Sequence, residues 1–285
     1  MIDLHLHTTA SDGRLAPAAL SALAANAGLA VIAVTDHDTV AGLAEARTAA
    51  QAHGLRLVNG IEITAVERAR DVHVLGYFFD PADRGLMRFL DRQRAARFDR
   101  VRAIAARLTT LGLFVDAEAL IRMAIDDCRS VGRPAIADAL VASGNAVDRQ
   151  DAFDRWLASG KPAYVERCGP AVADAIEAIT GAGGIASLAH PGLLGLDDEI
   201  ARFAASGLDA LEACHRDHDA TAEARYRAYA AQLDLAISGG SDFHGEHERT
   251  RAGVPWRPGA VTLTRDEFAA LESRACRGRK VNSGA

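Results

Sequence analysis

The sequence predicts an α/β fold, a distorted (βα)7-type barrel with a helical insertion domain over the active-site mouth. Two observations predict the barrel: short runs rich in Val, Ile and Leu alternate with Ala-rich segments of helical spacing, and residues of metal-ligand type follow most of the apolar runs. The alternation stops once, over a long stretch of helical pattern. With 285 residues, 49% of them hydrophobic, the chain can bury one large core and is not a disordered protein.

Strand and helix signals follow one another along the chain in the order typical of βαβ units. The predicted strands are residues 2–7, 30–35, 56–63, 72–77, 185–189, 208–213 and 235–238. The predicted helices are residues 17–27, 40–52, 171–182, 200–205 and 220–233. These helices are long enough to cross back over a parallel sheet, so we expect about seven or eight strands closed into a barrel.

A series of helical patterns rich in Arg and Ala interrupts this order from residue 84 to residue 159. Turn signals at Leu111-Gly112 and Ser143-Gly144 divide the stretch into separate helices. No Pro-rich or repetitive linker joins it to its surroundings. We therefore predict that residues 1–83 and 160–285 form a metal-binding barrel domain, and that residues 84–159 form an inserted helical domain that caps the substrate.

The charge and the cysteine content argue against several classes of protein. A net charge of -6 disfavours a broad basic surface for long nucleic acids, whereas a small anionic substrate is compatible with it where metal ions supply positive charge. The four cysteines lie far apart without a C-x-x-C pair, which favours reduced thiols in the cytoplasm over a thiolate metal site or a disulfide framework.

The N-terminal region resembles neither a secretory signal nor a membrane span. Asp3 and two histidines stand where a signal peptide needs a basic and an apolar run. The uncharged stretch 15–35 contains Pro17, Asn26 and Gly28, which indicates a helix, a turn and a strand. We expect a cytoplasmic protein with no membrane partner and no stable protein partner.

Two histidines lie on one side of the first predicted strand. The alternation of polar and apolar residues from residue 3 to residue 7 places His5 and His7 on the same face, where two imidazoles can bind one ion. An isolated pair of this kind is equally compatible with ordinary polar residues on a half-buried strand. Asp12, in the loop that follows, could return to the strand end as a carboxylate ligand or could cap the next helix.

Ligand-type residues also mark the other predicted strands. Those at strand ends are Asp36, His37, Asp38, Glu62, His190, Asp242 and His244, and His73 lies inside a strand. A lone His73 would more often be a core residue, but five such strand ends make coincidence the weaker explanation, because the carboxyl ends of barrel strands meet at one rim. Ionisable groups buried there need compensating charge. Imidazole and carboxylate donors without thiolates favour ions of Mn, Fe or Zn as the source of this compensating charge.

These residues occur in the order and spacing of a known family of metal hydrolases. The chain resembles the PHP family, named after polymerase and histidinol phosphatase, in the motifs Asp3-x-His5-x-His7, Ser11-Asp12-Gly13, Thr35-Asp36-His37-Asp38, Gly60-Ile61-Glu62, His190-Pro191 and Ser241-Asp242-x-His244. Within that family, residues 130–137 and 161–165 resemble the inserted domain of bacterial 3′,5′-nucleoside bisphosphate phosphatases. The resemblance spans almost the whole chain and implies a metal-dependent phosphoesterase.

The resemblance further implies two or three divalent metal ions. It places His5, His7, Glu62 and Asp242 around one ion, Asp12, His37 and His244 around a second, and Glu62, His73 and His190 around a third. Some relatives have histidine at the position of Asp12, whose harder oxygen donor favours Mn2+, with Fe2+ or Zn2+ as alternatives. Because such ions can activate water, no side-chain nucleophile is required.

The predicted catalytic residues are Asp12, His37 and His215, and the predicted substrate-binding residues are Arg129, Arg133, His215 and Asp38. His215 would contact phosphate or protonate the leaving oxygen, although a solvated loop histidine is equally compatible with its position. Arg133 is favoured for a phosphate contact because it sits in a Gly-Arg-Pro turn, whereas most Arg at helical spacing only solvate a surface. Asp38 would orient a ligand or approach the substrate.

The substrate implied by the resemblance is a 3′,5′-nucleoside bisphosphate, whose 3′ phosphate is removed to leave the 5′ monophosphate. One alternative is a 5′→3′ exoribonuclease that acts on short RNA. Another is a histidinol phosphate phosphatase, which the Arg-containing insertion disfavours because a second anionic group suits it better than a cationic amine. A non-catalytic binding or proofreading module is disfavoured because every ligand position is filled. The expected partners are therefore a small phosphorylated nucleotide and, as a second class, short oligonucleotides.

Overall fold

The computed structural model describes residues 1–126, 130–245 and 256–282. The chain divides into two compact units, one made of Met1–Phe89 with Pro170–Ala285 and the other of Leu90–Gly169. The expected inserted domain, residues 84–159, begins six residues and ends ten residues earlier along the chain than this second unit. The capping role expected of the inserted unit stays a prediction.

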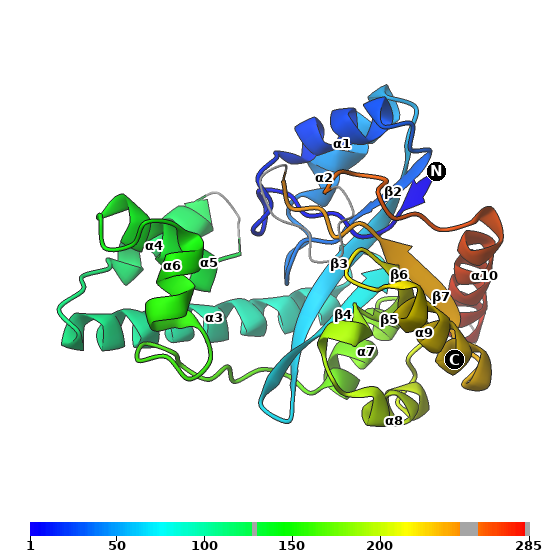
Figure 1. The fold of residues 1–285 in the computed structure, drawn as a ribbon. Helices are drawn as coiled ribbons and strands as arrows, with labels where there is room; N and C mark the ends of the chain where they lie inside the picture. Colours follow the sequence, from blue (N-terminus) through cyan, green and yellow to red (C-terminus); the bar gives the residue numbers. More distant parts are fainter. Residues whose placement is uncertain (127–129, 246–255, 283–285) are drawn as a thin grey trace. The chain divides into compact units, whose positions relative to one another are not determined.

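The first unit contains a nearly closed barrel. Seven strands of the described residues form one sheet in chain order (Figure 1): β1 (Ile2–Asp3), β2 (Val31–Val34), β3 (Arg56–Glu67), β4 (Arg70–Tyr77), β5 (Ile185–Leu188), β6 (Ala210–His215) and β7 (Ala236–Gly240). The two edges meet, because the N–H of Leu4 donates to the carbonyl of Gly239 at 3.2 Å and Leu6 forms a bridge with Phe243. The predicted distorted α/β barrel is confirmed.

β4 departs from the parallel arrangement that the sequence predicted. It is antiparallel to both β3 and β5, whereas the other neighbouring strands pair in parallel. Only Arg68 and Ala69 separate β3 from β4, and a parallel crossover needs about a dozen residues or more. Both residues have positive φ, 48° and 60°, as in a two-residue hairpin turn. The missing helical segment between the two strands was the signal for this hairpin.

The first predicted strand is shorter than expected, since β1 ends at Asp3 instead of continuing to His7. The Asp3 carboxylate accepts a hydrogen bond from the N–H of His5 at 3.3 Å, so this N–H is not available to a regular strand ladder. The same carboxylate accepts from the N–H and the hydroxyl of Ser241, at 3.0 Å and 2.7 Å. Asp3 therefore joins the start of the chain to the residues that follow β7.

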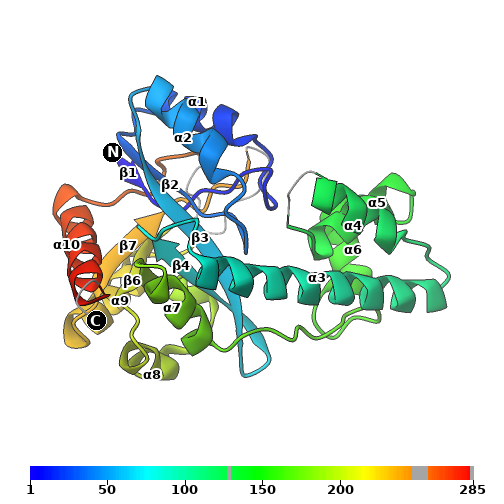
Figure 2. The same ribbon diagram turned by 180° about the vertical axis from the view of Figure 1, so that it is seen from behind.

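The helices of the first unit lie close to the predicted segments. They are α1 (Pro17–Asn26), α2 (Leu43–Ala52), α7 (Val172–Gly181), α8 (Ile200–Ala205) and α9 (Ala220–Gln232), with short 3-10 turns at η2 (Pro191–Leu193) and η3 (Asp197–Glu199). A further helix, α10 (Arg265–Asn282), was not predicted. Both ribbon views show it beside β7 (Figures 1 and 2), and its Phe268 and Leu271 share a core cluster with Ile2 and Tyr77.

The second unit is helical, as the sequence predicted. It contains most of α3 (Arg84–Thr110), together with α4 (Ala117–Asp126), α5 (Arg133–Ala142), α6 (Arg149–Ala152) and the π-helical turn η1 (Phe153–Leu157). Its core is built from buried aliphatic residues such as Leu108, Ile121, Ile136 and Leu140. Across the described residues of both units, we find no helix with the length and apolar character needed to span a bilayer.

Candidate metal centre

The nine residues predicted as metal ligands gather in the first unit, and we call this set the ligand cluster. It consists of His5, His7, Asp12, His37, Glu62, His73, His190, Asp242 and His244. The side chains of His5, His7 and Glu62 are 0 to 1% exposed, whereas those of Asp12 and His73 are 28% and 23% exposed. The cluster therefore has a closed base and an open rim. The role of these residues as ligands stays a prediction that the geometry below supports.

A first group of donor atoms is made by His5, His7, Glu62 and Asp242. His5 Nε2 lies 3.1 Å from His7 Nε2 and 3.4 Å from Asp242 Oδ1. Glu62 Oε2 lies 3.3 Å from His5 Nε2 and 3.1 Å from His7 Nε2. Donor atoms about 2.1 Å from a common ion lie roughly 3.0–3.4 Å apart, so the spacing of the His5, His7 and Asp242 atoms fits one divalent cation, and Glu62 Oε2 lies beside both imidazoles.

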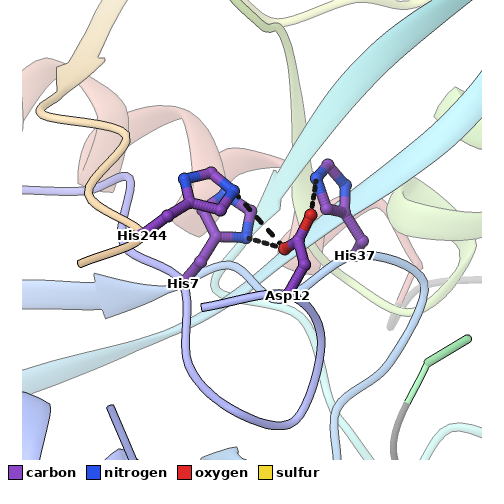
Figure 3. Close-up of side chains that lie close together, drawn as sticks. All are labelled: His7, Asp12, His37 and His244. Atoms are coloured by element: carbon purple, nitrogen blue, oxygen red, sulfur yellow. Dashed lines mark ion pairs between the residues drawn. The ribbon is translucent and has the colours of Figure 1, made fainter. Parts of the chain in front are cut away.

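A second group joins Asp12 to His37, His244 and His7. Asp12 Oδ1 lies 3.4 Å from His244 Nε2, and Asp12 Oδ2 lies 3.8 Å from His37 Nε2. Figure 3 shows the Asp12 carboxylate between the ring of His37 and the stacked rings of His7 and His244. Asp12 does not cap the next helix, because α1 begins after Ala16 without a side-chain cap. One carboxylate and three imidazoles thus face a common point.

The loop that carries Asp12 is held in place by Asp36. The Asp36 carboxylate accepts hydrogen bonds from the N–H and the hydroxyl of Thr8 and from the hydroxyl of Ser11, each at 2.7 Å. Gly13 completes the turn, since a Cβ atom there would lie 2.5 Å from the His7 carbonyl oxygen. Asp36 thus positions Asp12 through the loop of residues 8–13.

A third group surrounds the other oxygen of Glu62. Glu62 Oε1 lies 2.7 Å from His73 Nδ1 and 3.1 Å from His190 Nε2. Despite its short distance, His73 Nδ1 is a buried nitrogen without a hydrogen-bond partner among the described residues, and so is Nδ1 of His37, 3.3 Å from Glu62 Oε2. Close approach without hydrogen-bond direction is the geometry of lone pairs that converge on a cation. Glu62 therefore faces the first group with one oxygen and the third with the other.

Glu212 is a residue of the site that the sequence reasoning missed. Its side chain is fully buried in β6, where Oε1 accepts from His5 Nδ1 at 2.8 Å and Oε2 accepts from the backbone N–H of His190 at 2.7 Å. A proton on Nδ1 of His5 leaves the Nε2 lone pair free for an ion. The signal in the sequence was a glutamate between Leu211 and Ala213, inside an otherwise apolar strand.

Three residues at the site have a strained backbone. Asp38, His190 and Asp242 have φ values of 52°, 27° and 50°, in the left-handed region that favours glycine. A non-glycine residue in such a conformation costs of order 1 kcal/mol, and strain of this kind concentrates at functional sites. Two of the three are predicted ligands, so their side-chain directions depend on these unusual backbone angles.

The other predicted site residues have contacts of their own. His215 Nδ1 accepts from the N–H of Asp217 at 3.2 Å, so its proton lies on Nε2, which faces Asp242 Oδ2 at 3.4 Å. Asp38 Oδ1 accepts from the N–H of Thr64 at 2.8 Å and so connects the segment after β2 to β3. The catalytic role of His215 and the substrate contact of Asp38 stay predictions.

The predicted arginines belong to the second unit. The Arg133 guanidinium lies over the rings of Phe153 and Tyr164, at 5.7 Å from each centre. Its Nη1 donates to the carbonyl of Leu157 at 3.5 Å. Arg129 lies outside the described residues. The phosphate contacts expected of both residues stay predictions.

The histidines control the charge of the buried carboxylates. Burial raises the pKa of the Glu62 carboxyl, but the charges of His37 and His73 outweigh it and hold that pKa well below its usual range. The pKa values of Asp12 and Asp242 are lowered in the same way. Burial lowers the pKa of His7, but Asp242 and Glu62 raise it to about 10. The carboxylates are therefore ionised at neutral pH, and a proton on His7 competes with a cation.

Comparisons with known proteins identify the family of the chain. A model of the PHP domain matches residues 3–139. The chain is 34% identical to a 3′,5′-nucleoside bisphosphate phosphatase of Chromobacterium violaceum, over 88% of this chain and 89% of that protein. It is 36% identical to the 5′-3′ exoribonuclease Rnm of Escherichia coli, over 85% and 84%. A crystal structure from Bifidobacterium adolescentis, assigned as a metal-dependent phosphoesterase, superposes with a TM-score of 0.84 at 32% identity and covers 96% of each chain.

Proposed function

The chain belongs to the PHP family and is a metal-dependent phosphoesterase, and on this premise we propose that it removes the 3′ phosphate of a 3′,5′-nucleoside bisphosphate to leave the 5′ monophosphate. The observation that carries the proposal is the ligand cluster, in which imidazole and carboxylate donors form three groups and Glu62 belongs to two of them. The choice of substrate is supported by the relative of that activity, which is 34% identical over 88% of this chain.

We infer that the ligand cluster holds two or three divalent ions. The first group would be His5, His7, Glu62 and Asp242, the second Asp12, His37 and His244, and the third Glu62, His73 and His190. Bound there, the ions supply the Lewis acidity that activates water near neutral pH and offsets phosphoryl charge. Mn2+ is preferred, because carboxylate oxygens from Asp12, Glu62 and Asp242 enter the donor set.

The protein's own contribution is to hold these donors in position before the substrate arrives. Glu212 fixes the ring of His5 and the backbone of His190, and therefore supports the first and third groups at once. The Nε2 proton of His215 faces Asp242 Oδ2, which leaves Oδ1 directed at His5 and His7. Preorganised groups of this kind do not need to rearrange during the reaction.

The 5′→3′ exoribonuclease is the second candidate function. One observation favours it, the 36% identity to Rnm of Escherichia coli over 84% of that protein. Both activities transfer a phosphoryl group from a ribose 3′ oxygen to water, and they differ in whether that phosphoryl group is terminal or is esterified to the next nucleotide. The ligand cluster suits both, so substrate preference must decide between them.

Purified protein supplied with Mn2+ distinguishes the two functions. A nucleoside 3′,5′-bisphosphate, a nucleoside 3′-monophosphate, histidinol phosphate and short 5′-phosphorylated oligoribonucleotides would be compared at equal concentration. We expect the bisphosphate to have the highest kcat/KM and to yield the 5′ monophosphate with inorganic phosphate. A higher kcat/KM for the oligoribonucleotides would replace the proposed function with the exoribonuclease. No phosphate release with Mn2+, Fe2+ or Zn2+ would overturn both.

A further inference from the structure

Arg216 is a partly buried cation beside the ligand cluster, and neither its sequence context nor the comparisons assign it a role. It follows His215, the last residue of β6, and its side chain is 14% exposed. Its Nη2 lies 3.8 Å from Asp242 Oδ2, and its Nε lies 3.6 Å from Asp217 Oδ2. Both distances are too long for hydrogen bonds, so these carboxylates are charged neighbours that do not occupy its N–H groups.

Two of the three guanidinium nitrogens of Arg216 donate no hydrogen bond to the described residues. Nε and Nη1 are buried, and neither has a hydrogen-bond partner among the residues that the structure describes. A buried donor without an acceptor destabilises a protein, and the cost is larger for a charged group. Such a guanidinium is the natural partner of an anion that binds after folding.

Trp256 fixes the orientation of the Arg216 guanidinium, which stacks on the indole ring. The central carbon of the Arg216 guanidinium lies 3.4 Å from the centre of the Trp256 ring. The indole is fixed in turn, because its Nε1–H donates to the carbonyl of Asp242 at 3.0 Å. Stacking on an aromatic face restricts the side chain, and its N–H groups lie in the guanidinium plane and are not covered by the indole ring. The free donors are therefore oriented as well as buried.

The position of the Arg216 guanidinium next to the ligand cluster indicates which anion it binds. Asp242 Oδ1 lies 3.3 Å from His7 Nε2 in the ligand cluster, whereas Asp242 Oδ2 faces Arg216. One carboxylate thus separates the cluster from a planar fork of donors, which matches two oxygens of a phosphoryl group. We propose that Arg216 binds the phosphoryl group of the substrate at the ligand cluster. This inference rests on the proposed function, since it places the scissile phosphate at the same site.

A different role for Arg216 would be to orient Asp242 alone. In that case its loss would weaken Mn2+ binding, and phosphate binding would decline only as far as Mn2+ did. Binding of inorganic phosphate must therefore be measured both with and without Mn2+, alongside the number of Mn2+ ions bound per chain. Substitution of Trp156 by Phe leaves Trp256 as the only tryptophan, so that its fluorescence reports on the Arg216 stack.

The test compares Arg216→Ala and Arg216→Lys with a matched control. Arg155 also stacks on a tryptophan, Trp156 at 3.9 Å, but its side chain is 52% exposed and pairs with Asp151. Equilibrium dialysis of the full-length chain against labelled inorganic phosphate should show affinity about 10- to 100-fold weaker in Arg216→Ala, as expected for the loss of charge-assisted hydrogen bonds. Arg216→Lys should lose less, because it keeps the charge without the fork, and Arg155→Ala should match the wild type.

Three results of the binding measurements would overturn the proposal. They are wild-type protein that binds no phosphate without Mn2+, an Arg216→Ala variant that binds phosphate as the wild type does, and a loss of phosphate binding that only follows a loss of Mn2+. These outcomes are separate from the proposed function. Phosphate binding through Arg216 without hydrolysis of nucleotides would refute the substrate and keep the anion site. Hydrolysis of the bisphosphate with unchanged kcat and KM in Arg216→Ala would refute the anion site and keep the proposed substrate.

Discussion

The two units place their charged side chains in opposite environments. In the first, Glu62 and Glu212 are 1% and 0% exposed, and histidines are the nearest groups of opposite charge. In the second, Arg102 and Glu118 form a 2.7 Å pair in which the side chains are 46% and 55% exposed. A solvated pair contributes little to stability and points to no ligand, whereas buried carboxylates need a compensating cation. Burial, more than charge, therefore separates functional ionisable residues from surface ones in this chain.

The most severe test of this contrast removes Glu62. Glu62→Gln should reduce kcat by about 10³-fold or more and lower the number of Mn2+ ions bound per chain, because one carboxylate serves two groups of donors. His37→Ala should also abolish turnover. Steady-state kinetics and metal analysis measure both effects. Glu118→Gln, the same change at an exposed residue, is the control, and equal behaviour of the two Gln variants would contradict the contrast.

Substitution of Glu212 tests whether burial also identifies functional residues that position a metal ligand without contacting the ion. Glu212→Gln should weaken Mn2+ binding or activity by about 10- to 100-fold, because it removes the charge that orients His5 and His190. Glu199 is a suitable control, since it is also buried in the first unit but pairs with Arg68 and Arg202. If Glu199→Gln and Glu212→Gln have the same effect on Mn2+ affinity, Glu212 has no positioning role.

The pH dependence of metal binding sharpens the comparison further. Because neighbouring carboxylates raise the pKa of His7 to about 10, a proton must leave this ring before it can bind an ion. Mn2+ affinity should therefore rise with pH, by up to about tenfold per pH unit for each proton displaced. His37 should not add to this slope, because burial lowers its pKa to about 3. Calorimetric titrations between about pH 6 and 8 measure the slope, and an affinity that falls with pH would contradict the charge assignment.

The smallest expected effect concerns a cation of the second unit. Arg133→Ala should raise the KM for doubly phosphorylated substrates about tenfold and leave kcat nearly unchanged, as for a residue that binds substrate without stabilising the transition state. Arg102→Ala, which removes only an exposed ion pair, should stay within about twofold of the wild type. An unchanged KM in Arg133→Ala would leave the second unit without a known substrate contact.

The sequence by itself predicted the α/β barrel and the donors of the ligand cluster, because both appear as patterns within short stretches of the sequence. Apolar periodicity identifies strands, and the carboxyl ends of parallel strands lead to one rim whatever the details of packing. The role of His73 was harder to predict from the sequence, because this residue does not lie at a strand end. It lies inside an antiparallel strand, opposite Thr64.

Only the tertiary structure decided the supporting contacts. Glu212 is a single charged residue inside an apolar strand, and Arg216 lies in the polar run that follows this strand. Nothing within a few residues of either one indicates its partners. Glu212 contacts His5, which is 207 positions away in the sequence. Arg216 precedes β7 along the chain, whereas Trp256, on which it stacks, follows β7. Such contacts depend on which strands become neighbours when the barrel closes. That closure is set by packing of the whole unit and not by any local pattern.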